Sequence, residues 1–146
     1  MAYRSACFSP FPTKIVQTPG LIVMLLEGDG TSRQVYTDGR KFPGDPQPLW
    51  MGYSVGRWEG DTLVVETRGI NDKTWLDALG HPHSEDMRVT ERFHRRDFGH
   101  MDVQITIDDP KTYTKPFSVK VTHRLLPDTD ILEWYCAENE KDRKHL

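Results

Sequence analysis

Short runs in which apolar and polar residues alternate, each closed by turn residues, recur along the whole chain. Such alternation predicts β-strands, because successive side chains of a strand point to opposite faces of a sheet. Connectors rich in Gly and Asp, short enough for hairpins, join most of the runs, so successive strands are expected to pair as neighbours. The segments with this pattern are 14–17, 21–26, 33–37, 53–58, 62–67, 87–95, 100–108, 117–125 and 130–136.

A long meander of this kind removes its exposed edges by closing on itself. We therefore predict a single all-β domain over 1–146, an antiparallel up-and-down barrel of about eight or nine strands, similar to calycins and lipocalins. The ends, 1–12 and 139–146, are expected to be an extended arm and a flexible tail. In the long connection 69–86, Asn71 or Asp72 is expected to cap one short helical turn.

Charge argues against nucleic acid as a partner, and the short apolar runs argue against a membrane. The 22 acidic and 19 basic side chains are mixed along the chain and give a net charge of −3, so no electropositive face is expected for a phosphate backbone. The longest apolar run, Leu21–Leu26, is far shorter than the roughly 20 residues that span a bilayer. The expected partner is a small molecule, and a homodimer is possible.

Compartment stays open at this level. The chain as written opens without a basic segment followed by an apolar one, which favours the cytoplasm. Cys7 and Cys136 lie near opposite ends, and they would form a stabilising bridge in an oxidising compartment. Two free thiols are the equal alternative.

Three charged or titratable residues fall on faces that are otherwise apolar. Glu91 alternates with Met87, Val89 and Phe93, and the same logic turns Arg57 and His123 inward. A desolvated carboxylate has a raised pKa, and a guanidinium stabilises a developing anion, so Glu91 and Arg57 are candidate catalytic residues. The alternative is an Arg57–Glu91 ion pair that only closes one end of the barrel.

The long connection gathers a second set of polar groups. His83 is the candidate general acid or base, and Asp72 or Asp77 would orient it. His81 and His83 also form an HxH pair of the kind that binds zinc, copper or iron, provided that a distant residue such as His100 or His123 supplies a third ligand. We expect no cofactor, and the His81 and His83 metal site is the alternative to proton transfer.

Aromatic side chains are numerous enough to line an apolar cavity. The candidate ligand-binding residues are Tyr53, Trp58, Trp75, His123 and Trp134. The sequence contains no GxGxxG, P-loop, GxSxG or CxxC motif. Their absence argues against nucleotide binding, a hydrolase triad and a zinc ribbon.

The motif series GYSVGRWEGDTLVVET, NDKTWLD, GHPHSE and TERF resembles a family of usually exported bacterial proteins for which no activity is established. The resemblance extends from about Pro12 onward. It implies a barrel-like domain and a periplasmic or secreted location, and it implies no reaction.

These patterns favour a cofactor-independent acid–base enzyme of the lyase, isomerase, cyclase or hydratase type, acting on a small and largely apolar substrate. The first alternative is a non-catalytic carrier of an apolar ligand, and the second is a metal-dependent enzyme that uses His81 and His83. Sequence alone does not show whether the loop residues and the inward strand residues share one pocket.

Overall fold

The structure, a computed structural model, describes residues 11–45, 47–77 and 79–132. They form eight strands and one short 3-10 helix, η1. The elements are β1 (Thr13–Thr18), β2 (Leu21–Leu26), η1 (Glu27–Asp29), β3 (Thr31–Tyr36), β4 (Tyr53–Glu59), β5 (Thr62–Arg68), β6 (Arg88–Arg95), β7 (His100–Asp108) and β8 (Phe117–Arg124). In the described part of the chain, no helix is long and apolar enough to cross a membrane.

The strands lie in one sheet in the order of the sequence, from β1 to β8. Every neighbouring pair is antiparallel except β3 and β4, which run parallel and share only two residue pairs, Val35 with Ser54 and Tyr36 with Val55. A parallel pair needs a connection that carries the chain back along the sheet, and residues 37–52 supply it. This connection closes at Gly52, where φ is +63° and an added Cβ would lie 2.8 Å from the Arg68 carbonyl oxygen.

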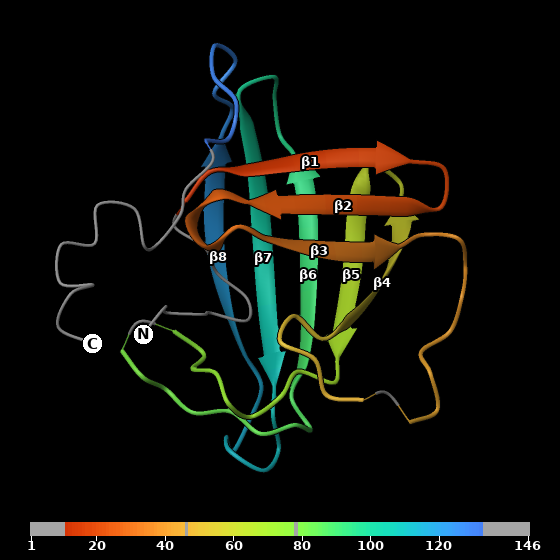
Figure 1. The fold of residues 1–146 in the computed structure, drawn as a ribbon, viewed down its shortest axis with the longest axis vertical. Helices are drawn as coiled ribbons and strands as arrows, with labels where there is room; N and C mark the ends of the chain where they lie inside the picture. Colours follow the sequence, from red (N-terminus) through yellow and green to blue (C-terminus); the bar gives the residue numbers. More distant parts are fainter. Residues whose placement is uncertain (1–10, 46, 78, 133–146) are drawn as a thin grey trace, which may run out of the picture.

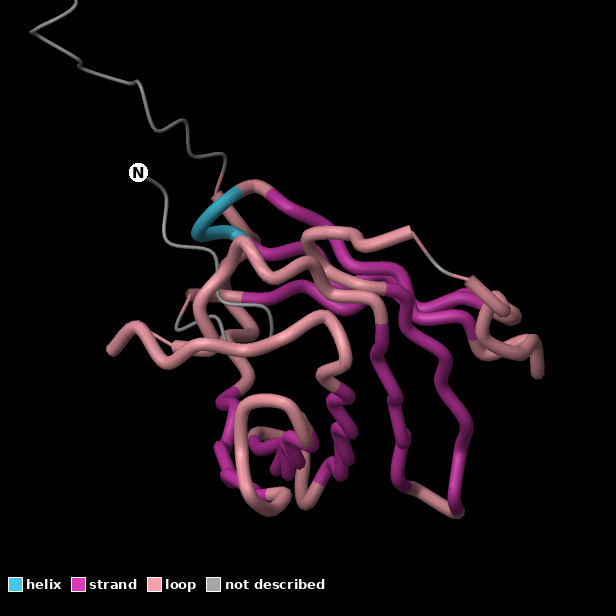
Figure 2. The backbone as a smooth tube through the Cα atoms, turned by 90° about the horizontal axis from the view of Figure 1, so that it is seen from below, coloured by secondary structure: helices cyan, strands magenta, loops and turns pink. Residues whose placement is uncertain are grey.

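The sheet curls into a half-barrel in which β1, β2 and β3 run across β4 to β8 (Figure 1). The tube seen from below shows the same curl as an open curve (Figure 2). Alternate side chains of both groups of strands meet in one hydrophobic core, as expected where two layers cross. The core residues are Ile22, Met24, Val35, Leu63, Val65, Ile70, Leu76, Met87, Val89, Phe93, Val103, Ile105 and Ile107.

The prediction of an all-β domain of about eight meandering strands is confirmed. The parallel pairing of β3 with β4 differs from the antiparallel prediction, and so do three further details. Over the described residues the half-barrel stays open, since β1 and β8 are the two edges of the sheet order. The helical turn lies at Glu27–Asp29, whereas residues 71–77 form turns without a helix. Residues 130–132 are not in a strand, and the rest of the predicted ninth strand lies outside the described residues.

Several further predictions also lie outside the described residues. They concern Cys7, Cys136, Trp134 and the segments 1–10 and 139–146.

Candidate functional site

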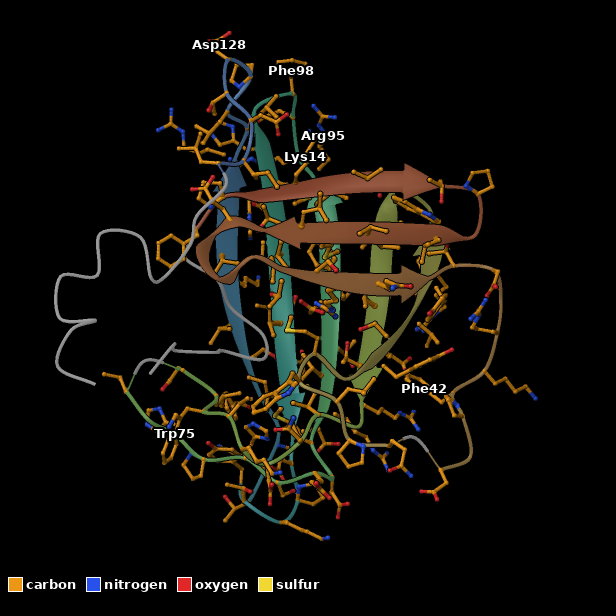
Figure 3. All side chains as sticks on the ribbon, in the orientation of Figure 1. Lys14, Phe42, Trp75, Arg95, Phe98 and Asp128 are labelled. Atoms are coloured by element: carbon orange, nitrogen blue, oxygen red, sulfur yellow. The ribbon has the colours of Figure 1, made fainter. Side chains whose placement is uncertain are left out.

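A hollow of about 270 Å³ opens at one end of the half-barrel. The connection between β5 and β6, residues 69–87, supplies all of its lining. The lining residues are Asp72, Lys73, Thr74, Trp75, Pro82 and His83. Trp75 marks this end in Figure 3, opposite the end that carries Phe98 and Asp128.

Buried apolar residues and local hydrogen bonds hold this connection in place. Ile70, Leu76 and Met87 are buried in the core. The Asn71 side-chain oxygen accepts a hydrogen bond from the Lys73 backbone N–H at 3.0 Å, which makes a turn of the type that Asn favours. The Leu76 N–H donates to the His81 carbonyl at 2.8 Å and draws the two sides of the loop together. Because turns satisfy these backbone groups, the expected helical turn does not form.

His83 lies on the wall of the hollow with 6% of its surface exposed. Its Nδ1 lies 3.2 Å from the Ser84 carbonyl oxygen, and its Nε2 lies 2.7 Å from Thr74 Oγ1. A carbonyl only accepts hydrogen bonds, so Nδ1 carries the proton of the neutral ring. Nε2 then has a lone pair and accepts the hydrogen bond that the Thr74 hydroxyl donates. The pair is a hydroxyl and an imidazole base facing one hollow.

Thr74 was not among the predicted site residues. It is buried, lines the hollow and supplies the only hydroxyl among the lining side chains. The sequence signal was weak, because a Thr between Lys73 and Trp75 is ordinary in a polar loop. Only the fold of the connection brings position 74 to position 83.

The predicted carboxylate orienters are not the groups bonded to the His83 ring. Asp77 instead lies 2.6 Å from His81 Nδ1, and that hydrogen bond holds the pKa of the Asp77 carboxyl below its ordinary value. Asp72 lines the hollow and is exposed. The backbone of Ser84 orients the ring, so Asp77 as an orienter of His83 is a correction to the sequence prediction.

The two histidines of the HxH segment have separate environments. His81 is exposed and paired with Asp77, whereas His83 is buried against Thr74. His100, one of the possible third ligands, is paired with Asp97 at 2.9 Å. Over residues 11–45, 47–77 and 79–132, no three or more His, Cys, Asp or Glu side chains gather in a way that would hold a metal ion.

Glu91 on β6 is buried on the core face, as predicted, with 3% of its surface exposed. The identity of its ion-pair partner corrects the sequence prediction. Arg33 of β3, not Arg57, forms the ion pair with it, and Arg33 Nη1 donates to Glu91 Oε1 at 3.0 Å. Arg33 Nε also donates to Ser54 Oγ at 3.1 Å, and Arg33 Nη2 donates to Thr67 Oγ1 at 2.7 Å. Strands β3, β4, β5 and β6 thus each contribute one member of a buried polar network.

Arg57 points to the opposite face of β4. It is exposed and pairs with Glu59 at 3.0 Å and with Glu66 at 2.9 Å. The inward face of β4 holds Ser54 and Gly56 instead. These small residues are needed there, because Ser54 accepts the Arg33 hydrogen bond and a Cβ on Gly56 would lie 2.9 Å from Val35.

His123 of β8 is partly buried, in agreement with the inward prediction. Burial lowers the pKa of its imidazole, and the Glu91 charge opposes that shift in part. Neither His123 nor Glu91 lines the hollow, so the loop site and the inward strand residues do not share that pocket.

Of the predicted aromatic ligand contacts that the structure describes, Trp75 alone lines the hollow. Tyr53 stacks on Tyr36 with ring centroids 5.2 Å apart, and Phe42 of the 37–52 connection packs beside it at 6.1 Å. Trp58 is half exposed on β4. Tyr53 therefore helps to hold the 37–52 connection rather than a ligand in this hollow.

Comparisons of the chain with protein-family models, with curated proteins and with solved structures found no match.

Proposed function

We propose that this protein binds a small molecule in the hollow and moves a proton on it through the Thr74–His83 pair. The single observation that carries the proposal is the 2.7 Å contact between Thr74 Oγ1 and His83 Nε2 on the wall of an open hollow. A neutral imidazole carries one nitrogen lone pair, which can accept a proton from a bound molecule.

The lining favours a small ligand with one apolar face and one polar group. The Trp75 side chain keeps 53% of its surface exposed, and Pro82 adds a second apolar surface. An exposed indole offers a large rigid surface for a flat ligand. Asp72 and Lys73 place one negative and one positive charge at the same hollow, and these fix the orientation of a polar group.

The chemistry proposed is acid–base catalysis without a cofactor, as in an isomerisation, elimination or hydration. His83 Nε2 takes a proton from a substrate group that replaces the Thr74 hydroxyl beside it, and the electron pair of the broken bond stays on the substrate. The imidazolium returns the proton to the substrate in a later step. The Ser84 carbonyl stabilises the imidazolium, because it accepts a hydrogen bond from the N–H that remains at Nδ1.

A carrier without turnover is the second candidate. Both ring nitrogens of His83 already have protein partners, which is the arrangement expected of a residue that only shapes a pocket. Such a carrier would release its ligand chemically unchanged.

The test is a ligand-observed NMR screen of small apolar molecules that carry one polar group, followed by incubation of each bound compound with the protein. We expect Trp75→Ala to weaken binding, and His83→Gln to abolish conversion while binding is retained. His81→Gln is the matched control, because it removes an exposed imidazole from the same loop. Conversion that is equal in His83→Gln and in the unmodified protein would overturn the catalytic proposal. Bound compounds recovered unchanged from all variants would identify a carrier.

A further inference from the structure

The two residues that flank His83 are both held by a distant segment, the connection between β7 and β8. Tyr113 Oη donates to the Pro82 carbonyl at 2.8 Å. Asp109 accepts twice from Ser84, at Oδ2 from the backbone N–H at 2.6 Å and at Oδ1 from the hydroxyl at 2.7 Å. In Figure 1 this connection lies at the same end of the half-barrel as the connection that carries the hollow.

Asp109 is built as a buried, ionised acceptor. Only 1% of its surface is exposed. Burial raises the pKa of its carboxyl, but hydrogen bonds from Ser84, Thr112 and the Lys111 backbone outweigh burial and hold the pKa below its ordinary value. An ionised carboxylate accepts and never donates, so it holds Ser84 in one orientation.

These contacts form one continuous chain of hydrogen bonds. Asp109 holds Ser84, the Ser84 carbonyl faces His83 Nδ1 at 3.2 Å, and His83 Nε2 faces Thr74 Oγ1 at 2.7 Å. The ring nitrogen that carries the proton is set by the hydrogen bond that the other nitrogen makes. A shift of the Ser84 carbonyl therefore changes which of the two ring nitrogens carries the proton.

We propose that Asp109 is a positioning residue for His83. By fixing Ser84, it keeps the Ser84 carbonyl against Nδ1 and leaves the Nε2 lone pair directed at the Thr74 hydroxyl. Tyr113 is the second anchor, on the other side of His83. This inference rests on the proposed function for its catalytic meaning, whereas its structural content, the tautomer of His83, is measurable by itself.

The test is long-range ¹H–¹⁵N NMR of protein labelled at histidine, with the His83 signals assigned by their loss in His83→Gln. In the unmodified protein we expect the neutral ring to be protonated at Nδ1. In Asp109→Asn we expect the population protonated at Nε2 to rise roughly fivefold, the equilibrium value of one ordinary hydrogen bond. Tyr113→Phe should change the same signals less, because it leaves Ser84 in place.

Asp86→Asn is the matched control. It removes a nearby carboxylate that pairs with Lys111 at 2.7 Å, and it leaves the Asp109 contacts to Ser84 intact. Its His83 signals should match those of the unmodified protein. Where Asp109→Asn does not fold, Ser84→Ala provides the same readout, because it removes the hydroxyl contact to Asp109, together with the hydrogen bond that the hydroxyl accepts from the Asp86 N–H.

The two proposals fail separately. An unchanged His83 tautomer in both Asp109→Asn and Ser84→Ala overturns the positioning role, whatever the activity does. A shifted tautomer together with conversion that does not depend on His83 overturns the catalytic proposal and leaves the positioning role standing.

Discussion

Among the buried polar clusters in the described part of the chain, two differ clearly in where they lie. The Arg33–Glu91 pair, with Ser54 and Thr67, sits inside the half-barrel on four strands. The Thr74–His83 pair sits in a loop and faces a hollow. Both are buried and both satisfy their hydrogen bonds, so burial and hydrogen bonding do not distinguish them. Access to a ligand distinguishes them, because a ligand reaches a buried group only where a hollow opens beside it.

This comparison separates a stabilising role from a functional one. A buried ion pair matters for stability mainly because removing one partner leaves the other charge buried without compensation. A neutral imidazole at a hollow has one nitrogen lone pair, which a ligand can reach by replacing the Thr74 hydroxyl. Substitutions in the interior network should therefore change stability and spare ligand binding, whereas substitutions at the hollow should change ligand binding or conversion.

The largest effect is expected from Arg33→Met, which leaves the Glu91 carboxylate buried without its partner. The free energy of unfolding should fall by about 3–5 kcal/mol, measured by urea denaturation. The double variant Arg33→Met with Glu91→Met should recover most of this loss, because no buried charge remains. A double variant as unstable as the single one would mean that the network stabilises by attraction. Ligand binding at the hollow should be unchanged in every variant that folds.

Thr74→Val is expected to have the next largest effect. The side chain keeps its shape and loses the hydroxyl, which leaves His83 Nε2 without its donor at a cost of about 1–3 kcal/mol. The same change should reduce conversion of a bound substrate by about 10²-fold or more. Denaturation and turnover measured on one sample check both. Lost stability with full turnover would place Thr74 with the structural residues.

A smaller effect concerns pH and His123. Burial lowers the pKa of this imidazole in the folded protein below its ordinary value of 6.5. The unfolded chain therefore binds more protons below pH 6.5, and stability falls as pH decreases from 6.5 toward the folded pKa. His123→Gln should flatten the dependence of unfolding free energy on pH in that window. If the unfolding free energy of the variant changed with pH as steeply as that of the unmodified protein, the lowered pKa of His123 would be contradicted.

The smallest effect is expected from Arg57→Ala. The exposed pairs with Glu59 and Glu66 contribute little, so the free energy of unfolding should change by no more than about 0.5 kcal/mol. Binding and conversion at the hollow should be unaffected. Lost conversion in a well-folded Arg57→Ala protein would revive the catalytic role predicted from the sequence.

Most of the fold could be predicted from the sequence, because alternation and turn residues are local signals. They locate β2, from Leu21 to Leu26, and β7, from His100 to Asp108, at their observed ends. Whether the sheet closes depends on contacts between its two edges, and a local pattern holds no such information. The parallel pairing of β3 and β4 was missed for the same reason.

The residues on the inward faces of the strands show which predictions succeeded and which failed. Glu91 was found because its face in β6 is otherwise apolar. In β4 the apolar residues Tyr53 and Val55 indicated the wrong inward face. The inward positions hold Ser54 and Gly56, because Ser54 accepts a hydrogen bond from Arg33 of β3 and Gly56 leaves room for Val35 of β3.

Part of the candidate site was also predictable. Asp72, Trp75 and His83 were recognised because polar and aromatic residues gather in one long loop, and all three line the hollow. The partners of His83 were not recognised. Asp109 lies 25 residues from Ser84 in sequence, and only the folded sheet brings them together.

The narrow junction between β3 and β4 has a consequence for the order of folding. Strands β4 to β8 are joined by sequential antiparallel pairs, whereas β3 meets β4 in two residue pairs only. Local contacts form early in folding, so the β4 to β8 meander should assemble before β1 to β3 dock on it. Arg33 then reaches Glu91 after the rate-limiting step. Arg33→Met should accordingly accelerate unfolding and leave the folding rate nearly unchanged.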